Sequence, residues 1–450
     1  MLVFSTSPFF KRNLAVAWPL ALNALLMQSM LMIDTFLVSP LGEESVAAMG
    51  IASAIIAFFL GIQMALANGT QMILSRAYGS GNISTVSNNF FGGLTISLTT
   101  ASLFWLLLVS SDDFIISFLT DSISLRAKVQ EYLNISIYLI VFTAITQTIT
   151  ALFNGFAKTR IPLKGYLIEL PLNCAASYIY IYVFDLGVSG AALGSLTAIM
   201  VRTLYLTLCL KSDAGIALAL PENRTLFSQS IKKHMSEIFP FAANITILAI
   251  GITVYQLLFS QLSINEYVAI TLLYPWIRVG GQFITAWSHS AAILISQDIG
   301  SKSLDKLESS VNKSIDAAVV ISLISCVLFV GLHFAFPYVY PNLAQETYAA
   351  MAVIAPLYIF LPLVRGYNTV HGNILRAVGK TKEVFKINFT GQWVISLPLL
   401  ALIIFHFDGS IFWAFAIQPF EELIKALPFR HLARKTVKEF GEEQANALNY

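Results

Sequence analysis

Charge is the scarcest property of this sequence. Only 12% of the 450 residues are Asp, Glu, Lys or Arg, whereas 56% are hydrophobic and the mean hydropathy is +0.72. Soluble globular proteins usually carry about 25% charged residues, so the composition excludes an ordinary soluble domain and indicates a membrane protein. The net charge of +2 points to no partner. Because no basic tract of the kind that binds nucleic acid occurs, no nucleic-acid partner is expected.

Cysteines and catalytic motifs are also scarce. The three cysteines lie in apolar runs without metal-ligand spacing, so we expect them to be buried thiols: Cys174, Cys209 and Cys326. The sequence contains no phosphate-cradling G-x-x-x-x-G-K loop and no cluster of nucleophile, acid and base. We therefore expect no enzymatic activity, no ATP-driven pumping, no cofactor and no structural metal.

Long apolar runs are abundant. They are about 20 residues long, which is the length that crosses a bilayer as a helix, and strand-like alternation is absent. The run that follows Lys11 and Arg12 is too long for a cleavable signal peptide, so it is expected to remain as the first span. The sequence predicts an all-α integral membrane protein with twelve transmembrane helices, near 14–38, 46–68, 89–110, 133–156, 162–183, 188–210, 238–260, 267–295, 314–338, 347–375, 385–406 and 410–429.

Lysine and arginine are distributed unevenly among the predicted loops. If the N-terminus is cytoplasmic, the outer loops hold only Arg126 and Lys128, and the inner loops and tails hold the other loop bases. The positive-inside rule therefore predicts a multi-pass protein of the cytoplasmic (inner) membrane with both termini in the cytoplasm.

The sequence repeats itself. WPLALN at 18–23 aligns with FPFAAN at 239–244, and SRAYGSG at 75–81 aligns with SQDIGSK at 296–302 at the same offset. One residue further, AKTR at 157–160 meets GKTK at 379–382. Six spans per half give both halves one orientation, which predicts two parallel six-helix lobes around a central cleft, related by an axis along the membrane normal. The predicted lobes are 1–215 and 236–430, with a cytoplasmic connector at 216–235 and a cytoplasmic tail at 431–450.

Several short motifs point to one family. IDTFLVSPLG, LSRAYGSGN, GFAKTR and GAALGSLTA in the first half, with AAILISQDIGSKS and NILRAVGKTK in the second, resemble the multidrug and toxic compound extrusion (MATE) family. This family lies within the multidrug/oligosaccharidyl-lipid/polysaccharide exporter superfamily. The resemblance implies an exporter that exchanges protons or sodium ions for amphipathic, often cationic, small molecules by alternating access. Within the fourth motif, GAALG at 190–194 predicts a close helix–helix seam.

The resemblance also assigns an ion-coupling site. The family's coupling acid matches Asp34, although an Asp at the centre of a membrane helix costs roughly 2.5–3.5 kcal/mol. In one branch, an N-x-x-x-D motif in span five corresponds to residues 173–177, so Asn173 is kept and Ser177 replaces the second acid. The hydroxyl of span six falls on Ser195. The resemblance thus implies coupling to H⁺ at Asp34, with Na⁺ at Asp34 and Asn173 as the alternative.

The second half departs from the family pattern. Acids that other members carry in spans seven and ten correspond here to Leu248 and Arg365, and the internal repeat pairs Asp34 with Tyr255. The resemblance therefore predicts ion coupling in the first half and no acidic cation site in the second.

Glu169 is a second unusual acid. It lies on one helical stripe with Asn173 and Ser177, about 12 Å from Ser177 toward the cytoplasm. It is interpreted either as a proton relay or as a helix-end acid near Lys164. Pro171 follows on the same helix and, with Pro19 in span one, marks a predicted bend.

Arg278 and Arg365 are interpreted as the only bases deep within spans. A guanidinium group keeps its charge, so each arginine needs a cavity or a partner. They are expected either to stabilise a lobe or to contact an anionic group of the substrate. The candidate cavity residues are Tyr178, Tyr255, Arg278, Gln282, Arg365 and Asn368.

Two transport functions follow. The leading hypothesis is a monomeric secondary active antiporter, surrounded by membrane lipid, that exports amphipathic small molecules. The alternative is a flippase or exporter of one endogenous anionic amphiphile or lipid-linked metabolite, which the two arginines and the missing acids of the second half favour.

Overall fold

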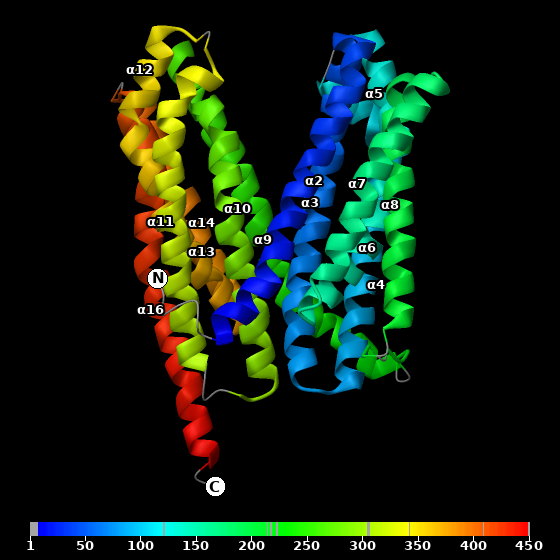
Figure 1. The fold of residues 1–450 in the computed structure, drawn as a ribbon, viewed down its shortest axis with the longest axis vertical. Coiled ribbons are helices and arrows are strands. Elements are labelled where there is room, and N and C mark those ends of the chain that lie inside the picture. The colour runs from blue at the N-terminus through cyan, green and yellow to red at the C-terminus, as the bar shows by residue number, and fades with distance from the viewer. Residues whose placement is uncertain are drawn as a thin grey trace. The chain divides into compact units, whose positions relative to one another are not determined.

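Helices form the described part of the chain. The computed structural model describes residues 8–119, 122–213, 215–216, 218–221, 224–303, 307–341, 343–407 and 409–448 (Figure 1). These ranges contain no strand, so the predicted all-α fold is confirmed. The first half comprises α2 (Pro8–Val38), α3 (Glu43–Gly79), α4 (Ile83–Leu119), α5 (Ile123–Ser136), α6 (Tyr138–Gly155), α7 (Arg160–Tyr178) and α8 (Gly187–Ser212).

The second half continues in the same way. Its helices are α9 (Arg224–Phe259), α10 (Ile264–Gly300), α11 (Leu307–Val339), α12 (Gln345–Val353), α13 (Ala355–Ala377), α14 (Thr381–Phe389), α15 (Leu397–Phe405) and α16 (Ile411–Leu448). π-Helical segments extend α7 at Ile179–Val183 and join α14 to α15 at Thr390–Ser396.

Each predicted span coincides with a helix or a broken helix. Within the described ranges, eight helical stretches are long and apolar enough to cross a membrane, and α12 with α13, bent by 44°, would make a ninth. The helices α7, α10 and α16 are not among them. The chain is therefore a multi-pass helical protein, and the number of twelve spans stays a prediction.

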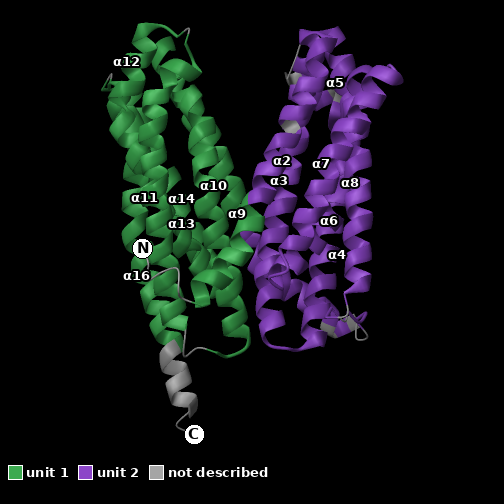
Figure 2. Cartoon of the chain, in the orientation of Figure 1, with its two compact units in different colours: residues 1–21, 243–450 green, residues 22–242 purple. Residues whose placement is uncertain are grey.

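The chain forms two compact units (Figure 2). Unit 1 comprises Met1–Ala21 and Ala243–Tyr450, and unit 2 comprises Leu22–Ala242. The divisions fall inside α2 and α9, shortly after the prolines that each helix contains, Pro19 and Pro240. The predicted connector at 216–235 includes residues 217, 222 and 223, which lie outside the described ranges, as do residues 1–7. The lobe boundaries stay a prediction.

Close helix packing shapes unit 2. A Cβ atom on Gly194 would lie 2.6 Å from the backbone nitrogen of Ser177, and one on Gly190 would lie 2.7 Å from that of Ile181. Only glycine permits so close an approach, and small residues of this kind hold helices together in membranes. The seam predicted at 190–194 is confirmed, and it joins α8 to α7 and the π-helical segment after it.

The internal repeat is present in the backbone. Ala157 and Gly379 occupy equivalent positions after α6 and α13, and both have positive φ, +59° and +83°. The next residue in each turn donates its N–H to a carbonyl five residues back, 2.8 Å away in both halves: Lys158 to Phe153 and Lys380 to Leu375. The turns at Gly81 and Lys302 also share a positive φ. The two halves therefore use the same turns at matching places.

The cysteines differ slightly from expectation. Cys174, Cys209 and Cys326 are free thiols, and all three are half-buried rather than fully buried.

Candidate functional site

Asp34 lies at one end of a hydrogen-bonded chain in unit 2. The Asp34 side chain on α2 is 6% exposed. Ser195 on α8 donates its hydroxyl to Asp34 Oδ2 at 3.0 Å, and Asn173 on α7 donates its amide to Ser195 Oγ at 2.8 Å. Three residues that the sequence assigned to one site therefore meet, each from a different helix.

Several oxygens of this site have no hydrogen-bond partner. Asp34 Oδ1, Asn173 Oδ1 and Ser177 Oγ are buried and accept no hydrogen bond from any described residue. Carboxylate, amide and hydroxyl oxygens are the ligand atoms that hard cations prefer. The oxygen-rich composition fits either a proton on the carboxylate or a sodium ion, and Asp34 and Asn173 are the residues that would hold the ion.

The local fold explains how these residues meet. Gly194 lets α8 lie against α7 at Ser177, and the next residue, Ser195, thereby comes within reach of Asn173. On the other side, Tyr182 donates its hydroxyl to the backbone carbonyl of Leu37 at 2.6 Å. This contact fixes the end of α2 about one turn beyond Asp34.

Glu169 has a different environment from Asp34. Its Oε2 lies 3.0 Å from Arg202 Nη1 on α8, and the two side chains are 4% and 3% exposed. The guanidinium carbon of Arg202 also lies 3.6 Å from the centre of the Tyr166 ring. Glu169 is thus a buried, paired carboxylate whose partner is Arg202 rather than Lys164. A relay role for Glu169 stays a prediction.

Arg202 is a third base deep within a span. The interpretation that Arg278 and Arg365 are the only bases deep within spans is wrong, because Arg202 is fully buried in α8, a helix apolar enough to span the membrane. The signal was available: a base within the apolar run 187–212, one span after the buried acid Glu169.

Unit 1 contains a cavity of about 400 Å³. Residues of α9, α10, α13, α14, α16 and the π-helical segment Thr390–Ser396 line it. Four of the six predicted cavity residues meet there: Tyr255, Arg278, Arg365 and Asn368. Gln282 does not line this cavity, and Tyr178 is an exposed residue of unit 2. A role of these residues in substrate binding stays a prediction.

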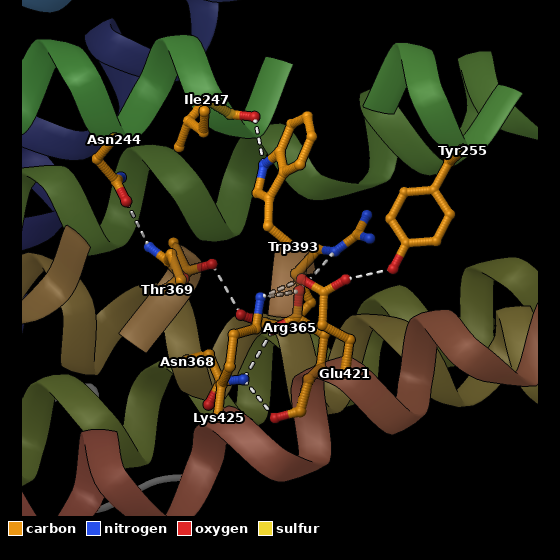
Figure 3. A network of polar contacts seen from close by, with 11 residues as sticks. Asn244, Ile247, Tyr255, Arg365, Asn368, Thr369, Trp393, Glu421 and Lys425 are labelled. Carbon is orange, nitrogen blue, oxygen red and sulfur yellow. Dashed lines mark hydrogen bonds and ion pairs between the residues drawn. The ribbon is translucent and has the colours of Figure 1, made fainter. Parts of the chain in front are cut away.

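Three charged residues of α16 form a network at this cavity, which we call the α16 triad: Glu421, Glu422 and Lys425 (Figure 3). Lys425 Nζ lies 2.8 Å from Glu421 Oε1 and 3.2 Å from Glu422 Oε1. All three residues are buried. A lysine therefore bridges two carboxylates within one helix turn.

Other helices complete this network. Tyr255 on α9 donates its hydroxyl to Glu421 Oε2 at 2.5 Å, and Asn368 on α13 donates its amide to Glu422 Oε2 at 2.7 Å. Arg365 Nε lies 3.6 Å from Glu422 Oε1. The positions that correspond to the family's acids, Leu248 and Arg365, carry none, and the buried acids of the second half are Glu421 and Glu422 on α16. The prediction that the second half has no acidic cation site stays a prediction.

The two predicted bends lie within continuous helices. Pro19 is inside α2 and Pro171 is inside α7. Their role as hinges stays a prediction.

The sequence is similar to known transporter proteins over most of its length. The family model of MatE matches residues 19–179 and 240–402. Multidrug and toxin extrusion protein 1 of Mus musculus is 23% identical over 418 residues, which cover 87% of this chain and 70% of that protein. A probable multidrug resistance protein NorM of Buchnera aphidicola is 22% identical over 442 residues, which cover 90% of this chain and 93% of that protein.

Solved structures share the fold. A crystal structure of MATE in the bent conformation superposes with a TM-score of 0.88 at 15% identity and covers 98% of both chains. An outward-facing MATE family transporter gives a TM-score of 0.84 at 15% identity over 96% of both chains.

Proposed function

Because the chain belongs to the MatE family of multidrug and toxin extrusion transporters, we propose that it is a secondary active antiporter that exports amphipathic small molecules in exchange for H⁺ by alternating access. Asp34 is the proposed coupling acid. The observation that carries the proposal is the environment of this carboxylate, which is buried and hydrogen-bonded through Oδ2 but unpartnered at Oδ1.

The absence of a basic partner distinguishes Asp34 from the other buried acids. No lysine or arginine of the described residues forms an ion pair with Asp34, whereas Arg202 pairs with Glu169 and Lys425 pairs with Glu421. A buried charge without a counter-charge is costly, so binding of a proton relieves that cost at Asp34. The paired carboxylates already have a buried counter-charge, so the same cost does not arise for them.

The hydrogen-bonded chain supplies a way to sense the bound proton. Ser195 donates to the Asp34 carboxylate, and a neutral carboxyl group accepts this bond less strongly. Protonation therefore loosens the hold of α8 on α2. In the proposed mechanism, α2 then bends near Pro19, where the ring removes a backbone hydrogen bond. The chain passes from one unit to the other two residues later.

Sodium is the alternative coupling ion. The unpartnered oxygens of Asp34, Asn173 and Ser177 support it, but Ser177 stands where the resemblance places a second acid. With one carboxylate instead of two, the site has less negative charge to hold a dehydrated sodium ion, whereas a single carboxylate is sufficient to bind a proton. The proposal therefore assigns coupling to H⁺, in a protein of the inner membrane with both termini in the cytoplasm that works as a monomer.

Reconstituted protein tests the proposal. Efflux of an amphipathic dye from proteoliposomes is measured under a proton gradient alone and under a sodium gradient alone. The wild type is expected to respond to the proton gradient, and Asp34→Asn is expected to lose the response. Glu43→Gln, which neutralises an exposed acid, is the matched control. Gradient-driven efflux by correctly folded Asp34→Asn protein would refute the coupling role, and a response to sodium alone would replace H⁺ by Na⁺.

A further inference from the structure

The unit 1 cavity carries more positive than negative charge. Its lining includes four bases, Arg278, Arg365, Arg376 and Lys425, but only two acids, Glu421 and Glu422. Four positive charges less two negative charges leave a formal charge of +2 on the walls. An excess charge in a partly enclosed space of low dielectric constant attracts an ion of the opposite sign.

The most exposed charges of the cavity are those of two arginines. The side chain of Arg365 is 42% exposed, and Arg278 is exposed as well. In contrast, the carboxylate side chains of Glu421 and Glu422 are only 7% and 11% exposed. The two guanidinium groups are therefore more accessible to a molecule in the cavity than the carboxylates are.

Protein partners neutralise the carboxylates but not all of the arginines. Lys425 and Tyr255 hold Glu421, and Lys425, Asn368 and Arg365 hold Glu422. Arg278 forms no ion pair and no hydrogen bond with any described residue. Its permanent charge is available to a ligand.

From these observations we propose that the unit 1 cavity binds the anionic group of an amphipathic cargo molecule, a carboxylate, sulfate or phosphate, through Arg278 and Arg365. Guanidinium groups bind such anions through paired N–H donors. The inference rests on the proposed efflux function and names the charge class of its cargo.

Apolar walls accommodate the rest of the cargo. Leu248 and Ile252 of α9, Ile277 of α10 and Phe429 of α16 line the same cavity. A volume of about 400 Å³ is within the range of pockets for small organic ligands. The cargo is therefore expected to carry its anionic group on a compact hydrophobic body.

The α16 triad positions the arginine rather than binding the cargo. Glu422 Oε1 lies 3.6 Å from Arg365 Nε, and Lys425 keeps Glu422 in place from within the same helix. Arg365 is thereby held near the cavity while much of its side chain stays exposed. Glu422 is a positioning residue in this arrangement.

Equilibrium binding tests the inference without any ion gradient. The full-length protein is placed in phosphatidylcholine nanodiscs and titrated with 4-methylumbelliferyl sulfate, with neutral 4-methylumbelliferone and with cationic ethidium. Arg278→Gln and Arg365→Gln are each expected to weaken sulfate binding about tenfold or more, because each removes a charge-assisted contact. Binding of the neutral compound should not change.

Several controls make the result specific. Arg430→Gln removes an exposed arginine of α16 outside the cavity lining and should leave sulfate affinity unchanged, and Arg365→Lys should retain part of it. Glu422→Gln removes the ion pair that positions Arg365 and should weaken sulfate binding, but by less than Arg365→Gln does, because the guanidinium group itself remains in the cavity. The titration imposes no ion gradient and measures no transport, which separates this inference from the test of ion coupling.

The source of the anion is tested in nanodiscs that contain phosphatidylglycerol. Displacement of the sulfate by this lipid in the wild type, but not in the arginine variants, identifies a lipid headgroup as the cargo. If the sulfate stays bound, the cargo is a soluble anion. Unchanged sulfate affinity in both arginine variants, or loss of ethidium binding in Glu422→Gln with unchanged sulfate affinity, would overturn the inference.

Discussion

Tyr255 donates a hydrogen bond to Glu421 across 2.5 Å in unit 1, and the internal repeat makes Tyr255 the counterpart of Asp34 in unit 2. In unit 2 the acid is on α2 and the hydroxyl of Ser195 is on α8. In unit 1 the hydroxyl is on α9 and the acid is on α16. The two halves have thus kept a contact between the first and the last of their helices but have exchanged the donor and the acceptor.

The exchange has an electrostatic consequence. Glu421 lies 2.8 Å from Lys425, whereas Asp34 has no basic partner among the described residues. The acid of unit 1 therefore has a counter-charge within its own helix, and the proposed coupling acid of unit 2 has none among the described residues.

Removal of Lys425 tests this difference. Lys425→Met leaves two buried carboxylates without their shared counter-charge, which is expected to lower the free energy of unfolding by about 3–5 kcal/mol. The measurement is thermal unfolding of the purified protein in detergent. Lys435→Met, at a side chain that is 63% exposed, should change stability by less than about 0.5 kcal/mol. Equal stability of the two variants would contradict the structural role of the triad.

The pair of Glu169 and Arg202 calls for a double-mutant cycle. Arg202→Met leaves the buried Glu169 carboxylate without a counter-charge and should lower the free energy of unfolding by about 3–5 kcal/mol. The double variant, which also carries Glu169→Gln, should recover most of this loss. Transport by Glu169→Gln then decides between the two interpretations of this acid. Normal proton-driven efflux indicates a purely structural pair, and loss of efflux in a stable variant indicates a relay.

Gly194 links packing to the coupling site. The Cβ of Gly194→Ala would lie 2.6 Å from the backbone nitrogen of Ser177, so α8 must move away from α7 and Ser195 must move away from Asn173. We expect lower thermal stability together with weaker proton-driven efflux. Gly61→Ala is the control, because nothing lies within 4 Å of its new Cβ and alanine favours a helix. A fully active and stable Gly194→Ala protein would show that the seam does not position Ser195.

The repeated turns give a reciprocal prediction. Ala157 has a φ of +59°, which an L-residue adopts only at a cost, and its counterpart is Gly379. Ala157→Gly should therefore raise the free energy of unfolding by up to about 1 kcal/mol, and Gly379→Ala should lower it by about 1–2 kcal/mol. Chemical denaturation of the two variants measures both effects, and changes of the same sign would contradict the shared backbone conformation.

The helices could be predicted from hydropathy because apolar runs in a membrane have no alternative that satisfies the backbone. Asp34, Asn173 and Ser195 were assigned to one site through the family resemblance, and the structure joins them by hydrogen bonds. Hydropathy alone contains no information about which faces of three helices meet, so the same assignment could not come from composition.

Three buried charged residues were not predicted from the sequence, and the reason is the same for all three. Arg202, Glu421 and Lys425 are charged residues whose partners lie on the same or an adjacent helix, so each acid–base pair is close to neutral and tolerates burial. Attention to single charges within apolar runs therefore does not identify them. The spacing of Glu421 and Lys425, four residues apart, was a usable signal.

The most direct test of proton coupling at Asp34 is infrared difference spectroscopy of the reconstituted protein between alkaline and acidic pH. The wild type is predicted to show a carbonyl band of a protonated carboxylic acid that disappears in Asp34→Asn and persists in Glu169→Gln. An identical band in wild type and Asp34→Asn would contradict the claim that this carboxyl group carries the transported proton.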